Sequence, residues 1–199
     1  MIRLIFLVTF LGFSTFPSYA QTTHKQALDF LTQFTQNNSK PGTPLYYTKG
    51  INSYSQNEIL KALQRSLVLY NFRIENHKVQ IIDSLVLSKE EQQFIIKELQ
   101  KQADTSLWNQ FEITNSQSIP KDTITAIFKD RANGWRNFYN SYGKSLFGFS
   151  IPIFFRDNQY CAFFYANSCG GLCGEELFSI YRKEFGAWSL WISVYESVS

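Results

Sequence analysis

Histidine and cysteine are scarce in this chain of 199 residues, which contains two histidines and three cysteines. His24 and His77 both lie far in sequence from the cysteines, so neither is placed to complete a zinc site or to act as the base for a nucleophilic thiol. His77 lies in a polar stretch and is expected in a solvated turn. The chain also lacks a GxSxG elbow, an HExxH helix and a phosphate-binding glycine loop. These absences favour a protein without a metal, a cofactor or a motif-based catalytic residue.

The first apolar run, from Leu4 to Phe13, is too short to span a bilayer, which needs roughly 20 apolar residues. It follows a single cation at Arg3 and precedes small residues that end at Ala20, an order typical of a cleavable signal peptide. We therefore predict a signal peptide over residues 1–20 and a soluble protein exported to the periplasm or the medium, with no membrane span after cleavage. No cysteine precedes Cys161, so the chain lacks the acylated cysteine of a lipoprotein.

Strong charge of one sign is also missing. The chain has 19 basic and 16 acidic residues, a net charge of +3, and loss of Arg3 with the signal peptide lowers this to +2. The basic residues are scattered singly, without the stripe that binds nucleic acid, so no nucleic-acid partner is predicted. Aromatic content is 17%, and a thick aromatic core is the favoured explanation over an aromatic ligand platform.

The 199 − 20 = 179 residues that remain have the length of one domain. We predict a single α+β domain over 21–199, with a helical part over about 21–143 and an antiparallel β-meander of about four strands over about 144–199. The helices are expected to pack on one face of this sheet.

Capping residues and apolar periodicity predict where the individual helices of the helical part begin and end. Thr23 is predicted to cap a helix over 24–36, followed by a loop to about Tyr54. Two capping-box patterns, Ser55 with Glu58 and Ser88 with Glu91, each predict the start of a helix. The remaining expectations are a short strand within 79–87, the end of the second capped helix near Gln102, and short helices at 123–128 and 135–139.

The C-terminal quarter changes to the two-residue period of strands. Alternate bulky residues predict a strand over 147–155, at a sheet edge or bulged because Pro152 cannot donate a ladder hydrogen bond. Further strands are predicted over 160–166, 177–182 and 187–195, joined by short turns.

Two cysteines, Cys169 and Cys173, flank a glycine-rich turn between the second and third of these strands. Glycines let the turn curl and bring the two thiols together, so a structural disulfide that pins the hairpin is the favoured interpretation. A thiol-disulfide redox site is the alternative, although CxxC spacing at a helix N-terminus is its usual form. Cys161 is then left over, either as a buried free thiol or as a site of intermolecular pairing.

Four residues form a candidate surface site: Glu175 and Glu176 after the hairpin, and Trp135 and Tyr139 in an aromatic cluster. The sequence favours a non-catalytic module that binds an envelope or extracellular protein or a glycan. A hydrolase without a recognisable motif is a further alternative. It would use carboxylates in the turns between strands, namely Glu175, Glu176, Asp157 and Glu184.

Three short motifs resemble a pattern in uncharacterised exported bacterial proteins: an S-x-P-x-F strand at 150–154, a CG-x-x-CG hairpin at 169–174 and a closing G-x-W strand at 186–188. The segment from Asp83 to Ser88 with Glu91 is similar to the same group. The resemblance covers about the last two-thirds of the chain after the signal. It implies the fold and the importance of the hairpin, and no named activity.

Overall fold

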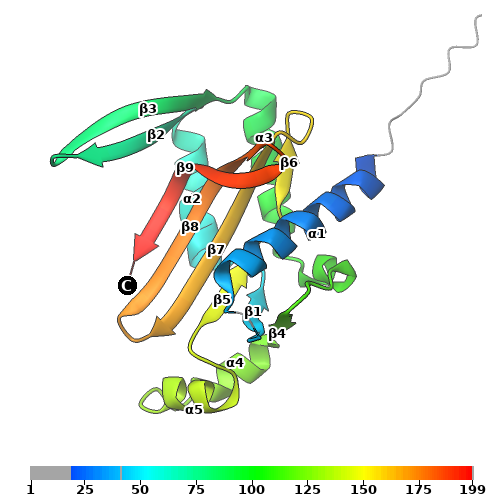
Figure 1. Cartoon of the computed structure of the whole chain (residues 1–199), viewed down its shortest axis with the longest axis vertical. Coiled ribbons are helices and arrows are strands. Elements are labelled where there is room, and N and C mark those ends of the chain that lie inside the picture. The colour runs from blue at the N-terminus through cyan, green and yellow to red at the C-terminus, as the bar shows by residue number, and fades with distance from the viewer. Residues whose placement is uncertain (1–18, 41, 199) are drawn as a thin grey trace, which may run out of the picture.

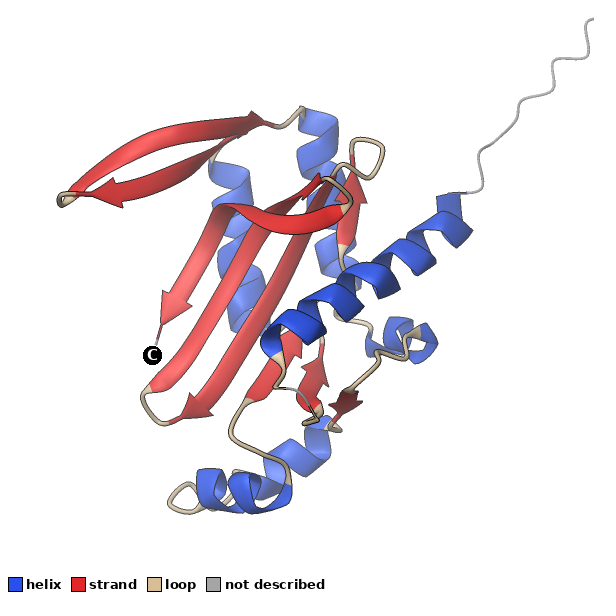
Figure 2. Ribbon diagram, viewed as in Figure 1, coloured by secondary structure: helices blue, strands red, loops and turns tan. Residues whose placement is uncertain are grey.

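The computed structural model describes residues 19–40 and 42–198, with side chains described from His24 onward. In this part of the chain the fold is α+β, as predicted, with a mixed seven-stranded sheet, a separate two-stranded hairpin and six helices (Figures 1 and 2). In chain order the elements are α1 (Tyr19–Asn38), β1 (Leu45–Lys49), α2 (Ser53–Arg65), β2 (Val68–Glu75), β3 (Lys78–Val86), α3 (Lys89–Lys101), the 3-10 helix η1 (Thr105–Gln110), β4 (Ser116–Ser118), α4 (Lys121–Ile127), α5 (Gly134–Ser141), β5 (Leu146–Phe149), β6 (Ile153–Phe155), β7 (Tyr160–Gly170), β8 (Cys173–Glu184) and β9 (Ala187–Val198).

The predicted signal peptide falls mainly on residues 1–18, which lie outside the described residues. Among the helices that are described, none is long and apolar enough to cross a membrane.

The C-terminal half of the main sheet is an antiparallel meander. β7, β8 and β9 pair in sequence order, which confirms this part of the prediction. The sheet is larger than the predicted four strands, because its order is β4-β1-β5-β7-β8-β9 and β6 also pairs with β7. β1 runs parallel to both β4 and β5, in a segment that the sequence predicted to be a loop. The part predicted to be helical therefore contributes two strands to the main sheet.

The strand predicted over 147–155 is interrupted between β5 and β6. Ser150 Oγ accepts a hydrogen bond from the Phe164 N–H at 2.8 Å, while the Ser150 N–H donates to the Phe164 carbonyl at 3.0 Å. The Gln102 side chain, 5% exposed, accepts from the Ile151 N–H at 2.7 Å and donates to the Ile151 carbonyl at 2.8 Å. The proline that follows has no N–H to satisfy. The side chains of Ser150 and Gln102 thus replace part of the backbone hydrogen bonding that the break in the strand removes. Through these bonds Gln102 also links the C-terminal end of α3 to the sheet.

Helices cover both faces of the main sheet, which corrects the prediction that they cover one. In Figure 1, α1 crosses in front of the strands, and α2 and α3 lie behind them. The reason is that the central strand is apolar on both sides: Cys161 and Phe163 of β7 pack with α1, whereas Ala162 and Phe164 pack with α2 and α3. Two cores therefore share one sheet.

The helix boundaries confirm one predicted capping box and correct the other. Ser88 and Glu91 form both reciprocal bonds of the box at the start of α3. The box predicted for Ser55 and Glu58 is wrong, because Asn52 caps α2 by accepting from the Ser55 N–H. Ser55 lies inside the helix and is fully buried.

At the N-terminus, α1 begins at Tyr19, so Thr23 lies within this helix and not at its cap. The helix predicted over 24–36 is otherwise α1.

The short strand predicted within 79–87 is one half of a hairpin. β2 and β3 pair antiparallel from Val68↔Val86 to Glu75↔Lys78, with a bulge after Asn71. His77 lies in the tight turn at φ 61°, as expected. The hairpin projects from the body of the protein as an arm (Figure 1).

Candidate functional site

A disulfide joins the end of β7 to the start of β8. Cys169 and Cys173 are bridged with their Cα atoms 5.1 Å apart, which confirms the predicted disulfide-pinned hairpin. Between them Gly170 adopts φ 151°, and a Cβ at this position would lie 3.3 Å from the hydroxyl of Tyr139. Both the backbone angle and the close approach of Tyr139 favour glycine where the hairpin tip meets α5.

The short helix α5 docks on this tip. The Tyr139 hydroxyl donates to the Cys169 carbonyl at 2.7 Å, so one predicted site residue contacts the disulfide hairpin directly. The rings of Trp135 and Tyr139 lie 5.7 Å apart with an interplanar angle of 32°. Trp135 also packs edge-on against Phe128 at 4.9 Å, and Tyr139 is 41% exposed. The ring of Trp135 thus anchors α5 to the end of α4, while the ring of Tyr139 is partly exposed to solvent.

The two predicted carboxylates lie on opposite faces of the sheet, because consecutive strand residues alternate. Glu175 accepts from the Tyr165 hydroxyl at 3.3 Å, on the side of the sheet that α1 covers. Burial, together with the negative charge of Glu175, raises the pKa of Tyr165 to about 12. Glu175 and Glu176 therefore do not form a carboxylate pair.

Glu176 belongs to a polar cluster at the N-terminus of α2. Its carboxylate accepts from the Ser55 hydroxyl, from the Asn52 side-chain amide at 3.1 Å and from the Tyr195 hydroxyl at 3.4 Å. Desolvation, with a smaller effect from the charge of Glu176, raises the pKa of Tyr195. Because Ser55 is fully buried, this cluster joins α2 to β8 and β9 without exposing a nucleophile.

The other carboxylates considered for hydrolysis are dispersed. Asp157 lies exposed in the turn between β6 and β7, and Glu184 lies exposed at the end of β8, where it pairs with Arg182 at 2.6 Å. In the described part of the chain, no group of three or more His, Cys, Asp or Glu side chains could hold a metal ion.

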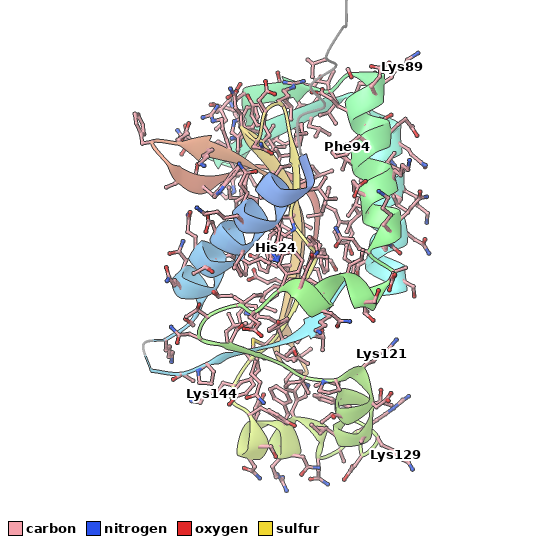
Figure 3. All side chains as sticks on the ribbon, turned by 90° about the vertical axis from the view of Figure 1, so that its right-hand side faces the viewer. His24, Lys89, Phe94, Lys121, Lys129 and Lys144 are labelled. Atoms are coloured by element: carbon pink, nitrogen blue, oxygen red, sulfur yellow. A yellow bond between two sulfur atoms is a disulfide. The ribbon has the colours of Figure 1, made fainter. Side chains whose placement is uncertain are left out.

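Positive charge gathers on the lobe formed by α4 and α5, residues 121–144. The lobe carries five cations, Lys121, Lys129, Arg131, Arg136 and Lys144, against two acids, Asp122 and Asp130. Its net charge of 5 − 2 = +3 equals the net charge of +3 of the whole chain. Figure 3 shows Lys121 and Lys129 on one edge of the lobe and Lys144 on the other. The sequence prediction of singly scattered basic residues missed this accumulation, which a charge count by segment would have found.

Within residues 19–40 and 42–198, the cations of the lobe form no ion pair. Every salt bridge found among the described residues lies elsewhere, for example between Lys61 and Glu58 or between Arg156 and Glu91. Asp130 is held locally: the Asn133 side chain and backbone donate to its carboxylate and lower its pKa, with a smaller effect from Arg136. Most of the positive charge of the lobe is therefore available to a ligand.

Two clefts flank the lobe. The first, about 430 Å³, lies beside the α5–β5 connection and is lined by Lys40, Lys144, Asn167 and Tyr46 among others. The second, about 550 Å³, lies beside the start of α4 and includes two further lysines. Neither is lined by an acidic residue. In the first cleft the side-chain oxygen of Asn167 is buried and has no hydrogen-bond partner in the described part of the chain.

Cys161, the third cysteine, is a free thiol with no exposed surface. Of the two predicted alternatives for it, the structure has the buried free thiol. Burial raises the pKa of its thiol well above the ordinary value, which disfavours the reactive thiolate.

Comparison of the chain with protein-family models, with curated proteins and with solved structures finds no match.

Proposed function

We propose that this protein is a non-catalytic binding module of the cell envelope or its exterior, and that it recognises an acidic glycan. The binding surface consists of the α4–α5 lobe, the cleft that contains Lys144 and the exposed ring of Tyr139. The observation that carries the proposal is the unpaired excess of positive charge on the lobe, which accounts for the net charge of the chain.

The chemistry of an acidic glycan fits these groups. Carboxylate or sulfate groups along the polymer pair with Lys40 and Lys144, which face one cleft without competing acids. The apolar face of a sugar ring stacks on an aromatic side chain, and Tyr139 offers a half-exposed ring that its hydroxyl holds against the disulfide hairpin.

Export is part of the proposal. A disulfide persists in oxidising compartments, so the Cys169–Cys173 bridge supports a periplasmic or extracellular location. The resemblance to uncharacterised exported bacterial proteins, carried by the motifs at 150–154, 169–174 and 186–188, belongs to the same proposal.

The enzymatic alternatives have less support. A redox site requires an activated thiolate, whereas Cys169 and Cys173 sit at strand ends, away from a helix N-terminus, with Glu175 following them. A two-carboxylate hydrolase requires two acids on one surface, and Glu175 and Glu176 point to opposite faces.

Affinity electrophoresis and calorimetry with alginate, a polyuronate, and dextran, a neutral glucan, test the proposal. We expect alginate and not dextran to bind. Lys144→Gln should raise the dissociation constant for alginate about 3- to 10-fold, because it removes one charge-assisted contact. Lys97→Gln removes the same charge from the exposed face of α3 and should leave binding unchanged.

Two substitutions of Tyr139 separate its ring from its hydroxyl. Tyr139→Phe keeps the stacking ring and should retain alginate binding, whereas Tyr139→Ala should weaken it roughly 3- to 10-fold. Equal loss in Lys144→Gln and Lys97→Gln would show a non-specific charge effect and contradict the proposal. Binding of single-stranded DNA as tight as that of alginate would assign the surface to anionic polymers in general.

A further inference from the structure

The arm formed by β2 and β3 exposes a continuous apolar face. Alternation along each strand places Tyr70, Phe72 and Ile74 of β2 on the same side as Val79 and Ile81 of β3, because the register pairs Phe72 with Ile81 and Ile74 with Val79. Each of these side chains is between 39% and 74% exposed. Val86 continues the face toward the base at 60% exposure, and Ile82, at the bulge, is 50% exposed.

Only the base of the arm is anchored to the body. Leu69 and Leu85, on the opposite side of the hairpin, belong to the core that α2 and α3 cover. Asp83 accepts from the Trp191 indole at 3.0 Å and pairs with Arg182 at 3.5 Å. Beyond this point the arm is a two-stranded sheet, and no third strand from the described residues pairs with it. Such a hairpin is marginal alone in water and gains stability when its apolar face is covered.

The size of the face matches what a stable dimer buries. Seven aliphatic or aromatic side chains, each about half exposed, offer roughly 700 Å² to a partner, close to the roughly 800 Å² per partner of a standard specific interface. They are Tyr70, Phe72, Ile74, Val79, Ile81, Ile82 and Val86. This area exceeds the few hundred Å² of a typical patch on a monomer.

The distribution of charge on the arm favours a second copy of this chain as the partner. The charged residues of the arm, among them Arg73 and Asp83, lie on the other side of the hairpin or at its tip, where Glu75 pairs across from Lys78. A twofold interface places the same patch on both subunits, so a face without charge meets no like charge on the partner. The charged tip also disfavours insertion of the arm into a bilayer.

We infer that the apolar face of the β2–β3 arm binds the same face of a second copy of this chain, forming a twofold symmetric dimer. The arm lies at the end of the molecule opposite the α4–α5 lobe (Figure 1), so the dimer and the glycan surface are independent.

Sedimentation velocity of the purified, oxidised protein over a concentration series tests this inference with a matched pair of variants. Ile81→Glu introduces a charge into the apolar face, and Gln80→Glu introduces the same charge one residue earlier, on the exposed opposite face. We expect the unaltered protein to dimerise reversibly. Ile81→Glu should weaken dimerisation roughly 100- to 1000-fold, since symmetry places the charge in the interface twice, and Gln80→Glu should leave it unchanged.

Hydrogen–deuterium exchange provides a readout independent of substitution. Backbone amides of 70–82 should become more protected as the unaltered protein is concentrated, while those of the lobe at 121–144 stay constant. Circular dichroism should show that both variants keep the fold, because both positions are exposed.

Four results would overturn the inference. A protein that stays monomeric into the hundred-micromolar range has no such dimer. A dimer that survives Ile81→Glu uses another surface, and one lost equally in both variants does not use this face. A monomer that instead co-sediments with vesicles of phosphatidylethanolamine and phosphatidylglycerol, and loses this binding in Ile81→Glu, would assign the arm to a lipid surface.

Discussion

Replacement of Gln102 by leucine is predicted to cost the protein a substantial part of its stability. The side chain of Gln102 satisfies both backbone groups of Ile151 at the break between β5 and β6, with bonds of 2.7 and 2.8 Å. Leucine has a similar size but can neither donate nor accept a hydrogen bond. The N–H and the carbonyl of Ile151 therefore both lose their partner. Each buried group left unsatisfied costs about 1–3 kcal/mol.

The expected loss in free energy of unfolding is about 2–4 kcal/mol, below the simple sum, because leucine gains some apolar burial. In addition, a cleft of about 280 Å³, lined by both Gln102 and Ile151, admits water to part of the site. Equilibrium unfolding in urea, followed by tryptophan fluorescence with the disulfide intact, measures this difference.

Gln100→Leu is the matched control, since Gln100 is exposed in the same helix and its substitution should change stability by less than about 0.5 kcal/mol. If Gln102→Leu is as stable as this control, the Ile151 groups do not depend on Gln102 and the reasoning is refuted. Gln102→Glu keeps an acceptor for the Ile151 N–H but loses the donor and adds a charge, so it should not rescue the protein.

Three further predictions concern the cysteines and one ion pair. Replacing Cys169 and Cys173 together by alanine should lower the free energy of unfolding by about 2 kcal/mol without loss of fold, and circular dichroism showing an unfolded chain would contradict this. Cys161 should resist iodoacetamide in the native protein and react only after unfolding; native alkylation seen by mass spectrometry would show that the thiol is accessible. Hydrogen bonding to Arg156 lowers the pKa of Glu91, so this pair stabilises the fold above the ordinary glutamate pKa and its contribution is lost as pH falls through the lowered value. The stability difference between Arg156→Gln and the unaltered protein should therefore be present at pH 7 and vanish in acid, and a difference independent of pH would refute the linkage.

Local signals predicted the elements whose partners are close in sequence. The box of Ser88 and Glu91 depends on four consecutive residues and was correct. The same pattern at Ser55 and Glu58 failed because Asn52, three residues earlier, caps the helix, and Ser55 is buried against Glu176 from a strand 121 residues away. A cap is therefore chosen in part by contacts that no local pattern contains.

Non-local pairing explains the missed strands. β1 pairs with β4 and β5 through Leu45↔Ser116 and Tyr47↔Phe147, so its partners lie about 70 and 100 residues away and no local pattern identifies them. Of the arm, only the strand within 79–87 was predicted, which is β3. Its partner β2 lies partly in the mostly polar segment from Asn71 to Lys78, and its outward apolar side chains are exposed and not buried.

The candidate site was predictable in part. The aromatic cluster identified Trp135 and Tyr139, and the glycine-rich CxxxC pattern identified the disulfide. The hydrogen bond that joins them, from Tyr139 to Cys169, spans 30 residues and has no sequence signal. Lys40 and Lys144 meet in one cleft only because the end of α1 and the start of β5 are brought together by the sheet.

The parallel pairing of β1 has a consequence for the order in which the chain folds. Residues 45–49 cannot join the sheet until β5, near residue 147, is available, so the closure of a loop of about 100 residues precedes the completed sheet. Such distant contacts make folding slow, because loop entropy is lost before native contacts compensate for it. A growing chain that lacks its last third therefore has no complete sheet on which α1 can settle. We expect such a chain to stay unfolded until β5 to β9 are made, and an unfolded chain is suited to the export that is proposed above.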